Sequence, residues 1–220
     1  MVRFERIGGA SGVLGVVAIA VQMMLVGTTA PDGQALAADR VRWEWTTLLR
    51  IAGGLGIIWF TAGLAARLRR FDARPALSAV EGSADPAGIV LGAGVLWGCI
   101  WLVSGLFNSV AIALATRYAD PQGVHLLTVL GLESILVLTP ALSIAFLTAT
   151  GVAILMEPTF PVRYAYVTLG GAAVRAALAV ADWYGAANYA VRILDFTLLW
   201  VVVTGVHLLG ATRPSAEAVQ

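Results

Sequence analysis

The 220 residues are 59% hydrophobic and only 12% charged, and their mean hydropathy is +0.85. This composition excludes an ordinary soluble domain and predicts an integral membrane protein. The 14 basic residues, all arginine, nearly balance 13 acids, and a net charge of +1 gives no electrostatic reason to expect a nucleic-acid partner. The single cysteine, Cys99, excludes an intrachain disulfide and a cysteine metal cluster. We expect no cofactor and no metal.

Hydrophobic segments recur along the whole chain. The longest, 124–156, has 33 residues and one charge, Glu133. A segment needs about 20 apolar residues to cross the roughly 30 Å hydrocarbon core. Six segments meet this length, namely 7–28, 46–68, 87–115, 124–156, 162–183 and 189–210. Because backbone polar groups in lipid must pair within their own segment, we expect an all-α polytopic membrane protein, a bundle of six transmembrane helices.

The N-terminal segment has two interpretations. It follows Arg3 and Arg6, and the sequence Ala35-Leu36-Ala37 resembles a cleavage box, as in a signal peptide. However, the apolar segment is as long as a full span, and the box lies about ten residues past its end. We therefore expect a retained first span.

The arginines predict the orientation of the chain. Eight lie on the side of the two termini and three on the opposite side: Arg3, Arg6, Arg67, Arg69, Arg70, Arg74, Arg163 and Arg213 against Arg40, Arg42 and Arg117. The positive-inside rule then places both termini in the cytoplasm. The proline-containing segment 71–86 is expected to be a cytoplasmic linker between a two-span hairpin, 1–70, and a four-span bundle, 87–220, within one membrane domain overall.

Small residues and aromatic residues indicate how the helices pack. Three glycine pairs have the small-xxx-small spacing that lets helix backbones approach closely: Gly8/Gly12, Gly88/Gly92 and Gly94/Gly98. Trp97 and Trp101 are one helical turn apart, which favours packing against a neighbouring helix over a ligand cage.

Pro140 predicts a kink in the fourth span. Proline cannot donate a hydrogen bond to the carbonyl of Leu136, and it bends a helix. Thr139 and Ser143 are adjacent and could satisfy the carbonyl that is left free. We favour a static bend over a hinge that gates a cavity.

Polar side chains inside the spans are the candidate functional residues. Ionisable groups there cost about 2.5–3.5 kcal/mol each on insertion scales, so they mark interior or functional positions. At about 1.5 Å per residue, Glu133 and Arg175 both come out roughly 13 Å inside the outer face, where they could meet. Arg50, Asp182 and Arg192 come out shallower. The candidate cavity residues are Glu133, Arg175, Asp195, Asn108, Gln22, Arg50, Asp182 and Arg192.

Two interpretations of these residues stay open. They could be structural ion pairs between helices, because the set holds three acids and three arginines and is neutral overall. They could instead line a polar cavity that opens outward and binds or transports a small molecule or ion. The one-sided depth distribution motivates the cavity. His125 and His207 fall on opposite sides of the membrane, so no shared metal or haem site is expected.

The sequence R-I-G-G-A-S-G-V-L-G at 6–15, followed by six spans with a basic loop at 67–74, resembles small six-span integral membrane proteins of unassigned function from high-GC bacteria. The resemblance is one of layout, and it implies a bacterial plasma membrane but no site residues.

Besides transport or ligand binding, two further functions stay open. One is an accessory subunit of a larger membrane complex, with a membrane-protein partner or a second copy packed on its Gly-rich and Trp-rich faces. The other is an intramembrane enzyme that uses Glu133 and Asp195 as acid and base on a lipid-like substrate. If the protein transports or binds a small molecule, its expected partners are the lipid bilayer and a small hydrophobic or ionic ligand.

Overall fold

The structure, a computed structural model, describes residues 2–26, 33–69, 85–118, 120–156, 160–183 and 196–210, without the side chains of Val2, Glu133, Asp182 and Trp183. The described part is all helical, as expected. Its elements are α1 (Val2–Val26), α2 (Gly33–Ala38), α3 (Arg40–Arg69), α4 (Pro86–Ala113), the π-helical turn η1 (Leu114–Tyr118), α5 (Pro121–Glu133), the π-helical turn η2 (Ser134–Leu138), α6 (Thr139–Met156), α7 (Val162–Trp183) and α9 (Phe196–Leu209).

Within the described residues, five helical stretches are long and apolar enough to cross a membrane, which supports the multi-pass architecture. They are Arg3–Val26, Arg40–Arg69, Pro86–Tyr118, Pro121–Met156 and Val162–Ala181. The 14 residues of α9 are apolar but rise only about 21 Å, less than the roughly 30 Å core. The expected sixth span begins within 184–195, outside the described residues, so six spans stay a prediction.

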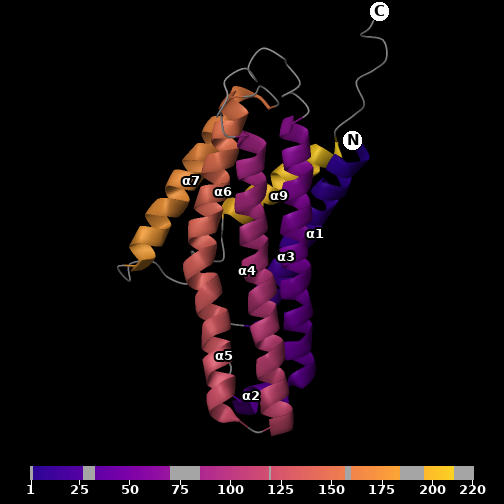
Figure 1. The fold of residues 1–220 in the computed structure, drawn as a ribbon, viewed down its shortest axis with the longest axis vertical. Helices are drawn as coiled ribbons and strands as arrows, with labels where there is room; N and C mark the ends of the chain where they lie inside the picture. The colour runs from indigo at the N-terminus through magenta and orange to yellow at the C-terminus, as the bar shows by residue number, and fades with distance from the viewer. Residues whose placement is uncertain are drawn as a thin grey trace, which may run out of the picture.

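The long helices stand side by side as an antiparallel bundle (Figure 1). Helix α3 packs between α1 and α4, and α4 also packs against α5 and α6. Helix α7 packs against α6 at one end and diverges from it toward the other, while α9 crosses behind the bundle to reach α1 (Figure 1). Gly9 lies against the backbone of Gly205, so α1 begins and α9 ends at the same end of the bundle.

Glycine contacts explain why α1 and α3 approach so closely. A methyl group added to Gly56 would come within 2.6 Å of Gly15 Cα, and one added to Gly8 would come within 2.7 Å of Gly63 Cα. Gly12 packs on Phe60 in the same interface. The close packing predicted for Gly8/Gly12 is therefore confirmed.

The two glycine pairs of α4 behave differently from each other. Gly94 packs against Thr61 and Gly98 against the backbone of Gly54, as expected. The prediction for Gly88/Gly92 is wrong, because a methyl group at Gly92 would meet nothing within 4 Å. A four-residue spacing defines a face of a helix, but the spacing does not say whether a neighbouring helix covers that face.

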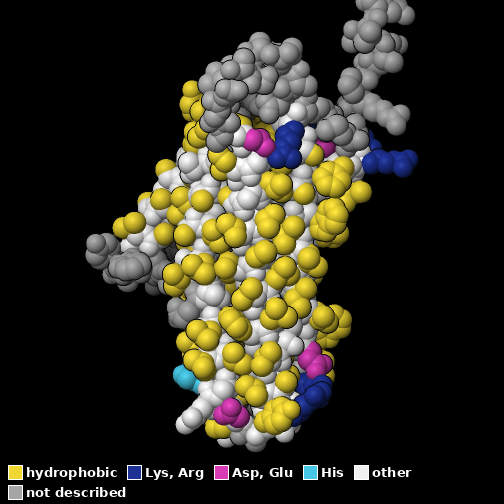
Figure 2. All heavy atoms as spheres, in the orientation of Figure 1, with side chains coloured by type: hydrophobic (Ala, Val, Ile, Leu, Met, Phe, Trp, Pro, Cys, Tyr) yellow, Lys and Arg dark blue, Asp and Glu magenta, His cyan; other side chains and the backbone are white. Residues whose placement is uncertain are grey.

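The interior is built around aromatic rings. Phe60, Trp97, Phe146 and Trp200 form one cluster, in which Trp97 and Phe146 have ring centroids 5.8 Å apart. Trp97 and Trp101 are both fully buried, which confirms that they pack within the bundle. On the surface, hydrophobic side chains cover the long middle of the molecule, and charged side chains gather toward its two ends (Figure 2). This is the pattern of a membrane-embedded bundle.

The short helix α2 closes the end of the bundle away from the start of α1. Leu36 is fully buried against Trp43, Ala111 and Val124, and Trp43 Nε1 donates a hydrogen bond to the Ala35 carbonyl at 3.2 Å. The sequence Ala35-Leu36-Ala37 is thus part of a packed end of the molecule.

The kink region differs in detail from expectation. The π-helical turn η2 ends at Leu138, two residues before Pro140, and joins α5 to α6. Ser143 Oγ donates to the Pro140 carbonyl at 3.0 Å, and within the described part of the chain Thr139 Oγ1 is buried without a hydrogen-bond partner. The prediction that these two hydroxyls satisfy the Leu136 carbonyl is therefore wrong. A helical hydroxyl reaches back only three or four residues, so Ser143 is too far along the chain.

Candidate functional site

Buried polar side chains join α3, α4 and α5. Asn108 Nδ2 donates to Thr47 Oγ1 at 2.6 Å and to the Trp43 carbonyl at 3.3 Å. One turn deeper, Arg50 Nη1 donates to Ser104 Oγ at 3.0 Å, and Ser104 Oγ donates to the Gly131 carbonyl at 2.8 Å. We call Thr47, Arg50, Ser104 and Asn108 the polar cluster; all four are buried.

Helical periodicity brings these side chains together. Ser104 and Asn108 are four residues apart on α4, and Thr47 and Arg50 are three apart on α3, so each pair lies on one helix face. Gly105 lets the two faces approach, since a methyl group there would lie only 3.0 Å from the Ile51 side chain of α3. The polar cluster is therefore held by backbone packing as well as by its own hydrogen bonds.

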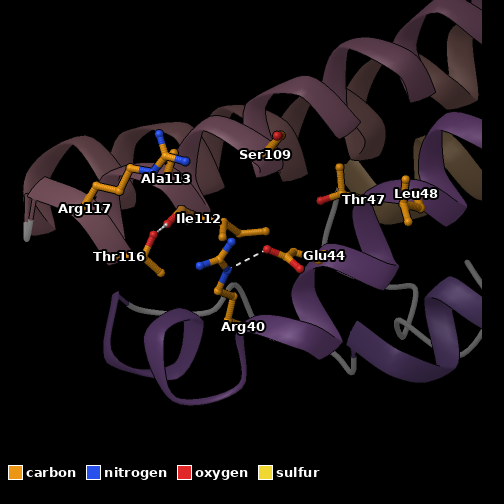
Figure 3. Close-up of a pocket in the computed structure, with 9 residues that line it drawn as sticks. All are labelled: Arg40, Glu44, Thr47, Leu48, Ser109, Ile112, Ala113, Thr116 and Arg117. Carbon is orange, nitrogen blue, oxygen red and sulfur yellow. Dashed lines mark hydrogen bonds and ion pairs between the residues drawn. The ribbon is translucent and has the colours of Figure 1, made fainter.

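A cavity of about 380 Å³ opens next to the polar cluster, between α3 on one side and α4 with η1 on the other (Figure 3). Its volume is within the range of small-molecule sites. The lining residues are Arg40, Glu44, Thr47, Leu48, Ser109, Ile112, Ala113, Thr116 and Arg117. Thr47 belongs both to this lining and to the polar cluster, and Ser109 follows Asn108 directly. The cavity and the buried hydrogen bonds are thus parts of one site.

The cavity walls carry charges of both signs. Arg40 Nε donates to Glu44 Oε1 at 2.6 Å, and both side chains are about half exposed. Arg117 has no ion-pair partner among the residues that the structure describes. Two arginines and one carboxylate give the cavity a net charge of about one positive unit. An exposed ion pair such as Arg40 with Glu44 stabilises the fold by at most ~1 kcal/mol.

Two of the predicted site residues, Arg50 and Asn108, come together here. Arg50 and Asn108 are in the polar cluster, and Gln22 is buried on α1. Ile19 of α1 contacts Gly53 of α3, and in this antiparallel register Gln22 lies level with Arg50. Helix α3 begins at Arg40 instead of Thr46, which places Arg50 about 15 Å from the start of the helix, and the depth of Arg50 in the membrane stays a prediction.

The expected meeting of Glu133 and Arg175 stays a prediction, because the side chain of Glu133 is not described. Gly151 of α6 packs against Leu169 of α7. From that contact, Arg175 is six residues and Glu133 eighteen residues further toward the cavity end, so the two backbones differ in height by roughly 18 Å. Arg175 itself is buried.

Several predicted site residues are not tested. Asp195 and Arg192 lie outside the described residues, and the side chains of Glu133 and Asp182 are not described. The proposed acid and base of an intramembrane enzyme, Glu133 and Asp195, therefore stay a prediction.

Sequence reasoning missed a buried ion pair at the end opposite the cavity. Arg67 Nη1 lies 3.2 Å from Glu5 Oε2, with the Glu5 side chain fully buried and the Arg67 side chain 17% exposed. The sequence places Arg67 in the basic loop after the second span, and Glu5 is not among the predicted site residues. The available signal was that Glu5 is the only acid in the first 31 residues and begins an apolar segment.

The charged lining of the cavity, Arg40, Glu44 and Arg117, was also missed as a site. These residues flank the apolar segments and look like ordinary interfacial charges. Among the described residues, no group of three or more histidine, cysteine or acidic side chains could hold a metal ion. Comparisons with family models, with curated proteins and with solved structures found no match to this chain.

Proposed function

We propose that this multi-pass membrane protein binds a small polar molecule or ion in the cavity between α3 and α4 and transports it through the polar cluster. The observation that carries the proposal is the position of Thr47, which lines the cavity and accepts a hydrogen bond from buried Asn108. A buried polar group in lipid is costly unless it is paired, so a connected set beside an open cavity favours a site over incidental packing.

The distribution of arginines supports an outward-facing cavity. Arg40, Arg42 and Arg117 lie at the cavity end, while Arg3, Arg6, Arg67, Arg69 and Arg163 lie at the end where α1 begins. By the positive-inside rule, the arginine-rich end faces the cytoplasm, and the cavity faces the outside of a plasma membrane. The adjacency of the start of α1 and the end of α9 favours an even number of crossings, six when α9 completes the last one.

Hydrogen-bond partners continue inward from the cavity. A solute that leaves the cavity first meets Asn108 and Thr47, and about one turn deeper it meets Arg50 and Ser104. Together these side chains offer donors and acceptors over about 6 Å of depth, the rise of four helical residues. A polar solute could exchange partners stepwise along this face of α4.

Permeation in proteoliposomes tests the proposal. Stopped-flow light scattering would follow the entry of urea, glycerol, sodium phosphate and potassium chloride into vesicles with and without the full-length protein. We expect at least one solute to enter more than tenfold faster with the protein, and Asn108→Leu to remove this gain. Trp45→Phe is the control, because Trp45 is exposed on the surface of α3 outside the cavity lining. Equal rates for protein-containing and empty vesicles would contradict transport.

A further inference from the structure

Arg117 is a cation at the wall of the cavity. It lies on the π-helical turn η1, and its side chain is exposed. No described carboxylate lies within ion-pairing distance of its guanidinium. The close-up shows the Arg117 side chain extending along η1 toward Ala113 on the cavity wall (Figure 3). A guanidinium without an internal partner can pair with an anion from outside.

The second cation of the cavity is held by a carboxylate that could be displaced. Arg40 and Glu44 are one turn apart on α3 and project into the same space (Figure 3). Their contact is solvent-exposed, so it contributes little to stability and its geometry can change at small cost. An anion bound to Arg117 could therefore recruit Arg40 away from Glu44. Ser109 also lines the cavity and adds a hydroxyl donor.

From these observations we infer that the cavity binds a small oxyanion, a phosphate or carboxylate group, between Arg117 and Arg40, with Glu44 as the competing internal anion. This inference rests on the proposed function, because it names the class of ligand for the same cavity. Arginine is well suited to the role, since its planar fork donates two parallel hydrogen bonds to such a group.

The oxyanion could come from two sources. Leu48 lines the cavity and is 55% exposed on the surface of α3, so one wall of the cavity continues onto the apolar surface. A phospholipid could thus place its phosphate between the arginines and its acyl chains on that surface. A soluble anion could enter from water instead. The chemistry at the arginines is the same in both cases.

Two opposite charge changes test the inference. Binding of inorganic phosphate and of acetate would be measured by ligand-dependent thermal shift on the purified protein at constant ionic strength. We expect Arg117→Gln to raise Kd at least tenfold and Glu44→Gln to lower it severalfold, because the second change removes the competing anion. Arg163→Gln is the matched control, since it removes one positive charge at the other end of the bundle and should leave Kd unchanged.

A lipid source would be detected in nanodiscs of phosphatidylglycerol or phosphatidylcholine. If a lipid is the ligand, phosphatidylglycerol should co-purify with the wild type, and the amount bound to Arg117→Gln should be tenfold lower. Free phosphate and acetate should then displace the lipid only weakly. The inference is overturned if Arg117→Gln binds both free anions and anionic lipid as well as wild type does, or if Glu44→Gln weakens anion binding. In that case the proposed function would still hold if a neutral solute or a cation enters vesicles faster with the protein than without it, and if Asn108→Leu abolishes this faster entry.

Discussion

Glu5 is a fully buried carboxylate whose contact with Arg67 links the start of α1 to the end of α3. Removing one partner of a buried pair leaves the other charge in a poor environment, which costs about 3–5 kcal/mol when burial is complete. Because Arg67 is 17% exposed, we expect Glu5→Gln to cost about 2–3 kcal/mol. Thermal unfolding in detergent would measure this loss.

A double-mutant cycle separates the ion pair from simple loss of packing. We expect the double variant Glu5→Leu with Arg67→Leu to be more stable than either single variant, since neither charge of this pair is then left without the other. Additive losses in the cycle would show that the two side chains do not interact.

Asp85 makes stability depend on acid pH at the same end of the molecule. Burial by itself raises the pKa of this carboxyl. The hydrogen bond from Arg69 Nη2 at 2.8 Å, the positive charge of Arg69 and the backbone N–H groups of Gly88 and Ala87 together outweigh burial, so the pKa lies below its ordinary value of 3.8. A lowered pKa in the folded state means that this stabilisation is present above the unfolded pKa and is lost as the pH falls through the folded value.

We therefore expect wild type to be more stable than Asp85→Asn at about pH 6, by no more than ~1 kcal/mol because the pair is exposed, and the difference to shrink as the pH falls below the ordinary value of 3.8. Melting temperatures of both proteins across this range would measure it. A difference that is constant with pH would rule out the ion pair as its origin.

At the scale of elements, the α1–α3 interface depends on the absence of side chains. Any side chain at Gly56 must displace the backbone of α1, because even a methyl group would lie 2.6 Å from Gly15 Cα and from the Ser11 carbonyl oxygen. We expect Gly56→Ala to cost about 2 kcal/mol or more. Gly92→Ala is the matched control, because Gly92 has open space and alanine favours helix by up to about 1 kcal/mol. Equal unfolding temperatures for the two variants would contradict the close packing.

The helices themselves could be predicted from the sequence because every segment that spans the lipid must be a long apolar run. Long apolar runs located α1, α3, α4, α5 with α6, and α7 to within a few residues at most ends. The start of α3 was missed by six residues, since the polar sequence from Arg40 to Trp45 continues the helix beyond its apolar part. The short helix α2 is held in place because Leu36 is buried against other segments, and its local sequence pattern does not predict this packing.

At the scale of the whole molecule, the site could be predicted only in part. Arg50 and Asn108 were found because polar groups within apolar runs are costly and must be paired. Their partners Thr47 and Ser104 are common residues in membrane helices, and only the register between α3 and α4 singles them out. The lining residues Arg40, Glu44 and Arg117 come from helix ends that are far apart in the sequence, so the cavity follows from the tertiary arrangement.

The proposed site requires that water reaches the cavity from outside the cell, and cysteine labelling of intact cells tests this most directly. In a Cys99→Ser background, Ser109→Cys places a thiol on the cavity wall, Leu106→Cys places one on the exposed apolar surface of α4, and Arg163→Cys places one at the opposite end. With a membrane-impermeant sulfonated maleimide, we expect rapid labelling of Ser109→Cys from outside, no labelling of Leu106→Cys, and labelling of Arg163→Cys only after permeabilisation. Labelling of Arg163→Cys but not Ser109→Cys in intact cells would contradict the outward-facing cavity.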